Sequence, residues 1–292
     1  MILSRLAPAK VNLYLHVAAP DARGYHPLQS LVAFADIGDV VSLEASDGSA
    51  AYLRPRLKLS GPFSEGLEAD EGNLILKAVR AFEASTGIGV DRHDFHLAKT
   101  LPIASGLGGG SADAGAVLHL LRDAYAPDMA DETLSAIAAK TGADGVMCLW
   151  ARASLAEGYG ERLTRVKLPS VPAVLINPRV ACPTPAIYRG FDALGQFSTL
   201  DAIAEDIVNI EELTALLAGT RNDLQAPAVA LQPVIAEVLA ELEAQPETVF
   251  ARMSGSGATC FALCATDADA QALGHRMQLL RPGAWVAPCR LG

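Results

Sequence analysis

Apolar and polar residues alternate along several short segments of this chain, as they do in strands with one buried face. The clearest of these segments runs from Lys10 to Val17 and is rich in β-forming residues. From Ser30 to Leu43, two apolar runs are interrupted by Asp36, Gly38 and Asp39, so we expect two short strands there. Other apolar stretches of strand length cover residues 95–101, 146–150, 171–176 and 260–264.

Longer segments repeat their apolar residues at the helical period of about 3.6. Residues 74–86 form one such segment, with Asn73 before it as a candidate N-cap and Gly87 after it as a candidate stop. An Ala- and Leu-rich segment predicts a helix from about Ser111 to Tyr125. Further helices are expected at residues 129–141, 210–217, 233–243 and 267–280.

The expected strands come in clusters with helices between them, and regular β-α-β alternation is absent. This order favours an α+β fold over a doubly wound parallel sheet. The chain of 292 residues is long enough for two domains, and we expect the division between residues 150 and 170.

Composition and charge exclude several classes of protein. With 51% hydrophobic residues the chain can bury a large core, so intrinsic disorder is excluded. Charges interrupt every apolar stretch before the roughly 18 residues that a membrane span requires. The 33 acidic residues outnumber the 23 basic ones, which leaves no basic excess for binding a nucleic-acid duplex. A phosphate-bearing small molecule remains possible, because backbone amides and a single lysine can hold it.

The five cysteines stand at irregular spacings without a CxxC pair, at positions 148, 182, 260, 264 and 289. This pattern is typical of reduced, buried thiols in a cytosolic protein and not of a disulfide framework or a zinc site. The first residues lack an apolar segment followed by a small-residue cleavage site, so no secretory signal is expected. We therefore expect a cytoplasmic protein.

The most distinctive segment is a glycine-rich loop within LPIASGLGGGSADAG, residues 101–115. Glycine fills four of the five positions from Gly106 to Gly110, which costs conformational entropy and so needs a reason. Bare backbone lets a ligand approach closely, and successive N–H groups beside a helix N-terminus attract phosphate. Ser111 would cap that helix or offer its hydroxyl to a phosphate oxygen or metal. The alternative is a flexible turn between a strand and a helix.

Two well-known phosphate motifs do not fit this loop. The Walker A motif requires a lysine directly after the last glycine, and none follows here. The dinucleotide fingerprint requires a glycine where Ser111 stands. We therefore expect a phosphate loop of another type.

Two further segments complete a set with the glycine loop. Residues 7–13 read APAKVNL and residues 253–259 read MSGSGAT. In this order the three segments resemble the GHMP kinase superfamily of galactose, homoserine, mevalonate and phosphomevalonate kinases. The resemblance implies a two-domain α+β fold, with an N-terminal part like domain 2 of ribosomal protein S5 and a ferredoxin-like C-terminal part. It places an ATP-binding, catalytic domain at residues 1–160 and the second domain at residues 161–292.

Four more segments narrow the resemblance to one branch of the superfamily and extend it over nearly the whole chain. They are DARGYHPLQS at 21–30, KTGAD at 140–144, EGYGERL at 157–163 and RNDL at 221–224. The branch that these segments resemble uses ATP to phosphorylate the tertiary 2-hydroxyl of a cytidine-diphosphate-linked methylerythritol, and the resemblance implies the same reaction here. ATP would come with Mg²⁺, because phosphoryl transfer generally needs this cation. The reaction belongs to the non-mevalonate (methylerythritol phosphate) route to isoprenoids. We expect ATP and this small molecule as the ligands, no nucleic-acid or membrane partner, and a monomer or homodimer.

The resemblance assigns the catalytic roles to Lys10 and Asp144, which match the lysine and aspartate that flank the substrate hydroxyl in the family. Phosphoryl transfer depends mostly on positioning and charge stabilisation. An aspartate can accept or orient the proton of the attacking hydroxyl. A neighbouring lysine keeps that carboxylate ionised and stabilises charge on the transferred group. No cluster of metal ligands is visible in the sequence.

The resemblance also assigns residues to the cytidine substrate. Asn12 matches a polar wall of the pocket. Tyr25 would stack on the cytosine ring, and the imidazole or the backbone of His26 would read the edge of the base. Thr184 and Tyr188 match a threonine and an aromatic residue four positions on, so that Tyr188 would cover the other face of the base. The alternative for Tyr188 is a core residue.

The remaining residues implied by the resemblance surround the ATP phosphates. Lys99 lies near the nucleotide in this scheme, with an ordinary surface lysine as the alternative. Gly255, Ser256 and Gly257 of the third motif support the phosphate loop and form the floor of the site beside the substrate. The loop itself contributes Pro102, Gly106, Leu107, Gly108, Gly109, Gly110, Ser111 and Ala112.

Some features depart from the family pattern. Gly145 follows Asp144 where the family commonly has Val-Pro, so we expect a looser backbone after the carboxylate. Ser105 replaces a smaller residue before the loop. Asp113 is interpreted as an acidic residue in the first turn of a helix, where it suits the helix dipole. The alternatives left open are a homoserine- or mevalonate-type kinase and a non-catalytic nucleotide-binding protein on the same fold.

Overall fold

The computed structural model describes residues 2–45, 56–90, 93–200 and 206–292. Its strands are β1 (Ile2–Asn12), β2 (His16–Val17), β3 (Leu28–Ala45), β4 (Leu57–Ser60), β5 (His93–Ala98), β6 (Ser154–Gly158), β7 (Arg162–Arg165), β8 (Val171–Asn177), β9 (Thr248–Met253), β10 (Cys260–Cys264) and β11 (Trp285–Leu291). Its helices are α1 (Leu74–Thr86), α2 (Gly109–Tyr125), α3 (Asp131–Ala138), α4 (Gly145–Trp150), α5 (Thr184–Leu194), α6 (Ile210–Ala218), α7 (Gln225–Leu231), α8 (Val234–Glu243) and α9 (Asp267–Leu280).

The chain forms two compact units whose segments alternate along the sequence. Unit 1 contains residues 1–9, 37–103 and 108–151, and unit 2 contains residues 10–36, 104–107 and 152–292. The points of division fall inside β1, inside β3 and inside the glycine-rich loop. A functional division at about residue 160 remains a prediction, because these units are interleaved in the sequence.

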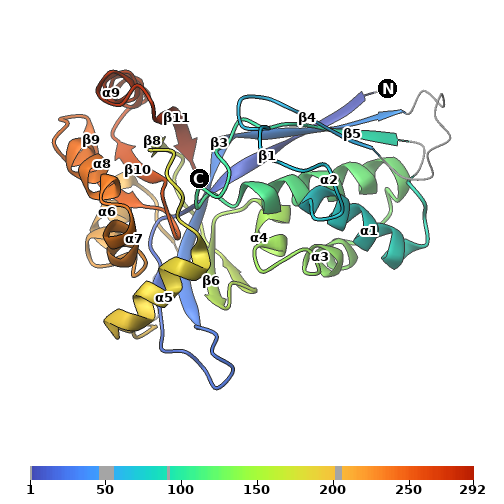
Figure 1. The fold of residues 1–292 in the computed structure, drawn as a ribbon, viewed down its shortest axis with the longest axis horizontal. Coiled ribbons are helices and arrows are strands. Elements are labelled where there is room, and N and C mark those ends of the chain that lie inside the picture. Colours follow the sequence, from blue (N-terminus) through green and yellow to red (C-terminus); the bar gives the residue numbers. More distant parts are fainter. Residues whose placement is uncertain (1, 46–55, 91–92, 201–205) are drawn as a thin grey trace. The chain divides into compact units, whose positions relative to one another are not determined.

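Unit 1 combines a small sheet with helices α1 to α4 (Figure 1). Strand β5 pairs antiparallel with the second part of β3 and parallel with β4. Helix α2 packs against α1 and α4, and residues 112–121 along it are all buried. Gly115 permits the close approach of α4, because a Cβ atom there would lie 2.8 Å from Leu149 Cα.

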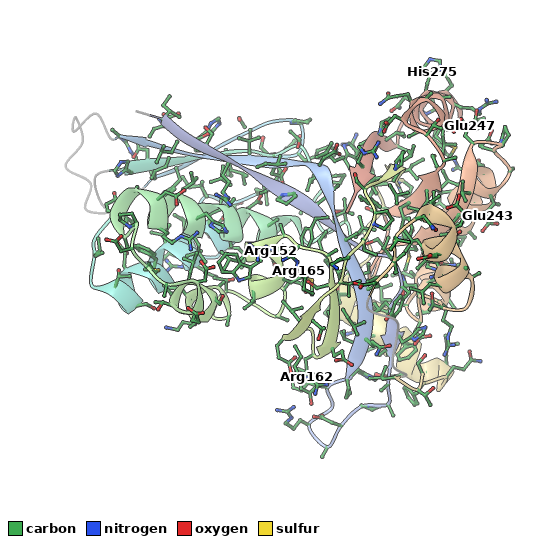
Figure 2. All side chains as sticks on the ribbon, turned by 180° about the vertical axis from the view of Figure 1, so that it is seen from behind. Arg152, Arg162, Arg165, Glu243, Glu247 and His275 are labelled. Atoms are coloured by element: carbon green, nitrogen blue, oxygen red, sulfur yellow. The ribbon has the colours of Figure 1, made fainter. Side chains whose placement is uncertain are left out.

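Unit 2 is built on the antiparallel order β9-β10-β8-β11. Alternate residues of the two central strands, Val174 and Ile176 of β8 and Cys260, Ala262 and Cys264 of β10, belong to one buried core with α8 and α9. The side-chain period of two thus places one face of the sheet against the helices. The strands β6 and β7 form a hairpin beside the first part of β3, with Arg162 and Arg165 on β7 (Figure 2).

The structure confirms the predicted α+β class and several element boundaries. Asn73 caps α1, since its side chain accepts a hydrogen bond from Ile75 N, and Gly87 ends the helix with φ of 72°. Helix α9 spans the predicted 267–280. The five cysteines are buried thiols, as expected. No helix in the described parts of the chain is long and apolar enough to cross a membrane.

The predicted strand at 146–150 is wrong, because these residues form helix α4. Its apolar run is too short for periodicity to separate a strand from a buried helix. Met147, Cys148 and Leu149 are buried, and α4 packs on α2. Tertiary packing therefore decides the conformation of this segment.

The two strands expected between Ser30 and Leu43 are one continuous strand, β3. The residues that seemed to interrupt it each have a specific role within the sheet. Gly38 lies so close to β1 that a Cβ atom would fall 2.0 Å from Ala7 O. The Asp36 carboxylate accepts a hydrogen bond from Arg290 N at 2.8 Å.

The predicted strand from Lys10 to Val17 is divided between β1, which ends at Asn12, and the short β2. The sequence analysis missed helix α5 because Pro183 and Pro185 suggested an irregular stretch. Pro183 is the N-cap of this helix and Pro185 lies in its first turn, where a missing N–H costs nothing. The other missed elements are β4, β6, β7, α7, β9 and β11.

Candidate active site

Lys10 and Asn12, at the end of β1, form the centre of the candidate site in unit 2. Lys10 is buried, and its Nζ donates to Asn12 Oδ1 at 2.8 Å. The Asn12 amide in turn donates to Ser30 Oγ at 2.7 Å. These two bonds fix which way the asparagine amide faces, so its oxygen is presented to the lysine.

The third motif, residues 253–259, lies directly against this pair. Asn12 N donates to Ser254 Oγ at 3.0 Å, and the Ser254 hydroxyl lies 3.3 Å from Gly106 O, to which it donates. Lys10 N also donates to Leu107 O at 2.8 Å. Unit 2 therefore brings together the first motif, the start of the glycine loop and the third motif.

Gly106 must be glycine for a reason that lies in the protein itself. Its φ of +79° is unfavourable for other residues, and a Cβ atom would lie 2.6 Å from Ser254 O and 2.9 Å from Gly257 O. The sequence suggested that a ligand approaches the bare backbone closely. At Gly106 it is the third motif that makes this close approach. Leu107 is completely buried, so only its backbone can serve a ligand.

The second half of the glycine loop belongs to unit 1 and leads directly into α2. Gly108, with φ of 64°, is the N-cap, and the helix begins at Gly109. The prediction that Ser111 is the N-cap is therefore wrong, because the glycines themselves enter the helix. Gly109, Gly110 and Ser111 form its first turn and carry N–H groups without a partner further back in the helix.

The other residues predicted to contact the nucleotide in this region have buried side chains or no side chain. Pro102 and Ala112 are buried. A Cβ atom at Gly109 would lie 3.0 Å from Lys99 Nζ, and one at Gly110 would lie 3.1 Å from Leu74 Cδ1. The first turn of α2 is thus packed against Lys99 at Gly109 and against Leu74 at Gly110.

Lys99 is not a surface lysine: it is 3% exposed and its Nζ donates to Asp39 Oδ2 at 2.5 Å and to Asp113 Oδ2 at 2.8 Å. Asp39 also accepts from Thr100 N and Leu101 N. Asp113 does not lie in the first turn of α2, so its interpretation as a partner of the helix dipole is wrong. The three side chains form a buried triad under the glycine loop's helix.

The triad has an unusual electrostatic balance. Burial alone would lower the pKa of Lys99, but Asp113 and Asp39 outweigh burial and raise that pKa. Burial raises the pKa of Asp113 to about 7; Lys99 opposes the rise and Asp39 adds to it. Asp113 Oδ1 has no hydrogen-bond partner among the described residues. Two carboxylates therefore share one ammonium group.

Asp144 precedes α4 in unit 1, and its backbone oxygen accepts from Cys148 N at 2.9 Å. Its carboxylate does not cap the helix. The backbone after it is not loose, contrary to expectation, because a Cβ atom at Gly145 would lie 2.1 Å from Ala138 O. Glycine is thus required here by close packing. Lys10 and Asp144 belong to different units, so their joint action remains a prediction.

His26 and Tyr188 lie side by side in unit 2, with ring centroids 5.5 Å apart. Both nitrogens of the His26 ring are engaged: Nδ1 donates to Ala18 O at 2.8 Å, and Nε2 lies 3.0 Å from Asp192 Oδ1. Tyr188 is half-buried and packs against the core of the unit. Tyr188 therefore has the packing role that was the alternative, and its ring also lies beside His26. Stacking of this ring on the base stays a prediction.

Tyr25 stands apart from this pair, 64% exposed, with its ring edge-on to Tyr159 at 6.2 Å. Its loop is held by Asp21, whose carboxylate accepts from Tyr25 N at 3.0 Å and from Tyr159 Oη at 2.7 Å. The hydrogen bond from Tyr159 and others at this site hold the pKa of Asp21 well below its usual range. The tyrosine is thus an exposed ring on a well-braced loop.

Thr184, at the start of α5, meets the third motif: its Oγ1 lies 3.0 Å from Ser256 Oγ. Sequence reasoning missed Ser30 and Ser254, which hold Asn12 in unit 2. It also missed Asp39, which holds Lys99 in unit 1. Ser254 could have been found from its place in the third motif. Ser30 could have been found in the same way, because it ends the segment 21–30. Nothing in the sequence marks Asp39 as the partner of Lys99.

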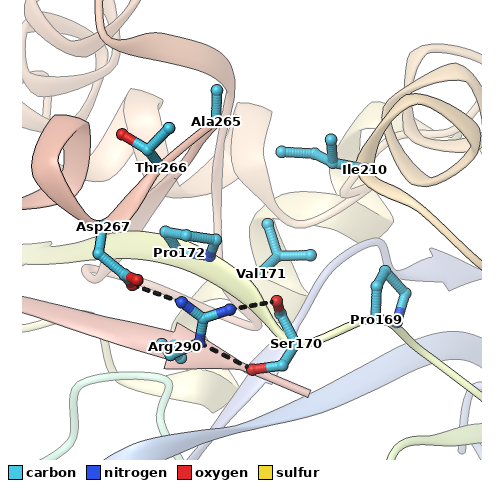
Figure 3. A pocket seen from close by; sticks show the side chains of 9 residues that line it. All are labelled: Pro169, Ser170, Val171, Pro172, Ile210, Ala265, Thr266, Asp267 and Arg290. Atoms are coloured by element: carbon cyan, nitrogen blue, oxygen red, sulfur yellow. Dashed lines mark hydrogen bonds and ion pairs between the residues drawn. The ribbon is translucent and has the colours of Figure 1, made fainter.

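A cavity of about 340 Å³ lies elsewhere in unit 2, between β11 and the start of α9 (Figure 3). None of the predicted site residues lines it. Its Arg290 is occupied by Asp267 and Ser170, with Nη1 donating to Asp267 Oδ1 at 2.5 Å and Nε to Ser170 Oγ at 3.0 Å. This cavity therefore offers no free cation to an anionic ligand.

Comparison with known proteins gives the same class as the fold and the motif order. The family model described as "GHMP kinases N terminal domain" matches residues 73–152, and "GHMP kinases C terminal" matches residues 199–280. A solved homoserine kinase from Cytophaga hutchinsonii shares the fold, with a TM-score of 0.69 at 20% identity over 99% of this chain and 94% of that chain. The fold is that of the GHMP kinases.

More similar relatives define the branch. The 4-diphosphocytidyl-2-C-methyl-D-erythritol kinases of Caulobacter sp. (strain K31) and Caulobacter vibrioides (strain NA1000) are 51% and 50% identical to this chain and cover 100% of it; the alignments span 99% and 100% of those proteins. A crystal structure of 4-(cytidine 5'-diphospho)-2C-methyl-D-erythritol kinase has a TM-score of 0.78 at 32% identity, covering 99% of both chains. The chain belongs to the family of 4-diphosphocytidyl-2-C-methyl-D-erythritol kinases.

Proposed function

We propose that this protein transfers the γ-phosphoryl group of ATP to the 2-hydroxyl of 4-diphosphocytidyl-2-C-methyl-D-erythritol in the methylerythritol phosphate pathway. The observation that carries the proposal is the arrangement around Asn12. Its side chain accepts from Lys10, and its backbone donates to Ser254 of the third motif. Full-length identity of 51% to a kinase of this name supports the substrate, and disfavours homoserine or mevalonate as the acceptor.

In the proposed mechanism Asp144 accepts or orients the proton of the 2-hydroxyl as its oxygen attacks the γ-phosphorus. Lys10 stabilises the negative charge on the transferred group, and Asn12 keeps the lysine in place through the 2.8 Å bond. Such groups act by being fixed before the reaction, in a site where charges are poorly screened by water.

The phosphates of ATP are proposed to bind the N–H groups of the first turn of α2, where the positive end of the helix favours anions. Among the residues that the structure describes, no group of three or more His, Cys, Asp and Glu could hold a metal ion. We propose that Mg²⁺ would come with ATP, since this cation is usually bound through substrate phosphates with only one or two carboxylates from the protein. Its chemical contribution there is to neutralise phosphate charge.

For the cytosine base we propose recognition by the backbone of His26, because both ring nitrogens of this residue are already engaged. Tyr188, beside His26, and Tyr25 are proposed as the aromatic faces. Thr184 and Ser256 lie in contact with each other. We propose that they line the site along the part of the substrate between its base and its reacting hydroxyl.

We place this activity in the cytoplasm, where ATP is available and buried thiols stay reduced. Its ligands are ATP and the cytidine substrate. The proposed assembly is a monomer or a homodimer.

A coupled assay tests the function. Purified protein with ATP and 4-diphosphocytidyl-2-C-methyl-D-erythritol is expected to release ADP in step with substrate consumption. Homoserine or mevalonate in its place is expected to give no more ADP than ATP alone. Equal turnover with either of these would indicate another member of the superfamily, and binding of ATP without any turnover would indicate a non-catalytic protein.

Replacing Tyr25 with alanine tests the proposed base recognition. Stacking of a base on an aromatic ring is worth about 1–3 kcal/mol, so Tyr25→Ala is expected to raise the Kd for cytidine diphosphate by about 5- to 150-fold. Because Tyr25 is 64% exposed, the variant should fold normally. Isothermal titration calorimetry measures the effect, with Tyr25→Phe as the control that keeps the ring. An unchanged Kd for Tyr25→Ala would rule out stacking on this residue.

A further inference from the structure

The segment Arg221-Asn222-Asp223-Leu224, between α6 and α7, belongs to the motifs of the family but has no role in the mechanism above. Asn222 and Asp223 are 6% and 8% exposed. The segment runs beside residues 15–17, since Leu15 N donates to Arg221 O and Asp223 N donates to Leu15 O. Buried polar side chains need partners, and these two residues have partners in different segments of unit 2.

Asn222 uses both N–H donors of its amide to hold the third motif. Its Nδ2 donates to Met253 O and to Gly255 O, both at 2.8 Å, and its Oδ1 accepts from Leu224 N at 3.0 Å. The Asn222 side chain therefore fixes two carbonyl groups at the start of the third motif. The bond from Leu224 N in turn fixes the orientation of that side chain.

A shift of that loop would displace Asn12 and Gly106, which lie against it. A Cβ atom at Gly255 would lie 3.1 Å from Asn12 Oδ1 and 3.2 Å from Gly106 O, so these groups are nearly in contact. The residue between the two bonded carbonyls is Ser254, which accepts from Asn12 N. Asn12 is also the partner of Lys10. Asn222 is thus linked to the lysine through the third motif and Asn12.

Asp223 points the other way, toward the wall that carries His26. Its Oδ2 accepts from Val17 N at 2.7 Å and from Ser198 Oγ at 2.5 Å. Val17 precedes Ala18, whose carbonyl accepts from the ring of His26. Two consecutive residues of one short segment therefore hold the two parts of the proposed site.

We propose that Asn222 is a positioning residue for phosphoryl transfer, which fixes the third motif against Asn12 and Gly106, and that Asp223 fixes the wall for the cytidine base. The inference rests on the proposed function, because it takes Lys10 and Gly106 as parts of the reacting centre. It assigns separate effects to two adjacent residues, which a general role in stability would not produce.

The isosteric variant Asn222→Asp tests the proposal, since it turns two donors into acceptors facing two carbonyl oxygens. We expect kcat to fall about 10- to 100-fold, the range for small misplacements of reacting groups. The Kd and stoichiometry of cytidine diphosphate, measured by calorimetry, should stay within about twofold. Asn222→Ala, which removes the donors without adding a charge, should give the same split and serves if the first variant does not fold.

Asp223→Asn is the matched comparison, because it keeps the shape of the neighbouring residue but removes the charge that accepts from Val17 N and Ser198 Oγ and pairs with Arg221. We expect the Kd for cytidine diphosphate to rise at least about fivefold, by a larger factor than kcat falls. A kcat of the Asn222 variants within twofold of the wild type would overturn the proposal, as would a joint loss of kcat and binding stoichiometry. Absence of turnover in the wild type would instead overturn the proposed function itself.

Discussion

Replacing Asp144 with asparagine is expected to lower kcat at least about 100-fold, because removal of a general base typically costs this much or more. The substitution keeps the size and shape of the side chain. It also leaves intact the backbone bond from Cys148 N to Asp144 O and the tight packing of Gly145 on Ala138. The change should therefore act on the proton of the substrate hydroxyl and not on helix α4.

The measurement compares steady-state rates with binding. The Kd for cytidine diphosphate and the KM for ATP should stay within about twofold of the wild type, since the lost interaction matters chiefly in the transition state. Asp128→Asn is the matched control, an exposed aspartate in the same unit, and its kcat should be unchanged. Retention of kcat within about twofold in Asp144→Asn would exclude the base role.

Replacing Lys99 with methionine is expected to destabilise the protein by about 3–5 kcal/mol at neutral pH, the cost of removing one partner of a buried ion pair. Lys99 and its partners Asp39 and Asp113 are all less than 4% exposed, so water cannot replace the lost ammonium group. The variant would leave two carboxylates buried side by side beneath the first turn of α2. Urea-induced unfolding followed by circular dichroism measures the loss.

The sign of the pH dependence is a second check on this variant. The pKa of Asp113 is raised to about 7 even with Lys99 present, against about 4 for an unfolded aspartate. The folded state therefore binds a proton more tightly, and stability falls as pH rises between these values. The loss in Lys99→Met should be smaller at pH 5 than at pH 8. A loss that is the same at both values would contradict this account of the triad.

A surface lysine of the same unit provides the control for Lys99→Met. The Lys58 side chain is 60% exposed and lies 3.9 Å from Asp94. Exposed pairs of this kind contribute about 0–1 kcal/mol, so Lys58→Met should unfold almost as the wild type does. An equal loss in both variants would show that burial of the triad is not the cause.

Local signals in the sequence were sufficient for elements whose ends are set by their own residues. Asn73 and Gly87 predicted both ends of α1 because capping depends on the backbone and one side chain. The limits of α9 were also predicted, and its capping box of Thr266 and Asp269 shows why: both partners lie within one turn. Such features need no knowledge of the rest of the fold.

Features set by distant residues could not be predicted in this way. The run at 146–150 is a helix because it packs on α2. Asp39 appeared to interrupt a strand but pairs with Lys99, 60 positions away. Only the folded chain reveals partners that are this remote.

Several residues that the sequence groups in the candidate site also lie together in the structure, but for other physical reasons than those expected. The motif order identified Lys10, Asn12, the glycine loop and the third motif, which the structure joins within unit 2 apart from the second half of the loop. Gly106 was expected to be bare for a ligand, yet it is bare because Ser254, 148 positions away, lies against it. The ring of His26 was a candidate reader of the base, but its nitrogens are already engaged.

The central claim is transfer of phosphate to the tertiary 2-hydroxyl, and the proton-coupled ³¹P spectrum of the reaction product tests it most directly. The carbon at that position bears no hydrogen, so the new phosphate monoester should give a resonance without three-bond splitting by a proton, while the diphosphate signals of the substrate persist. A doublet would place the phosphate on the secondary hydroxyl, and a triplet would place it on the primary one. Either pattern, or inorganic phosphate as the only new signal, would contradict the account.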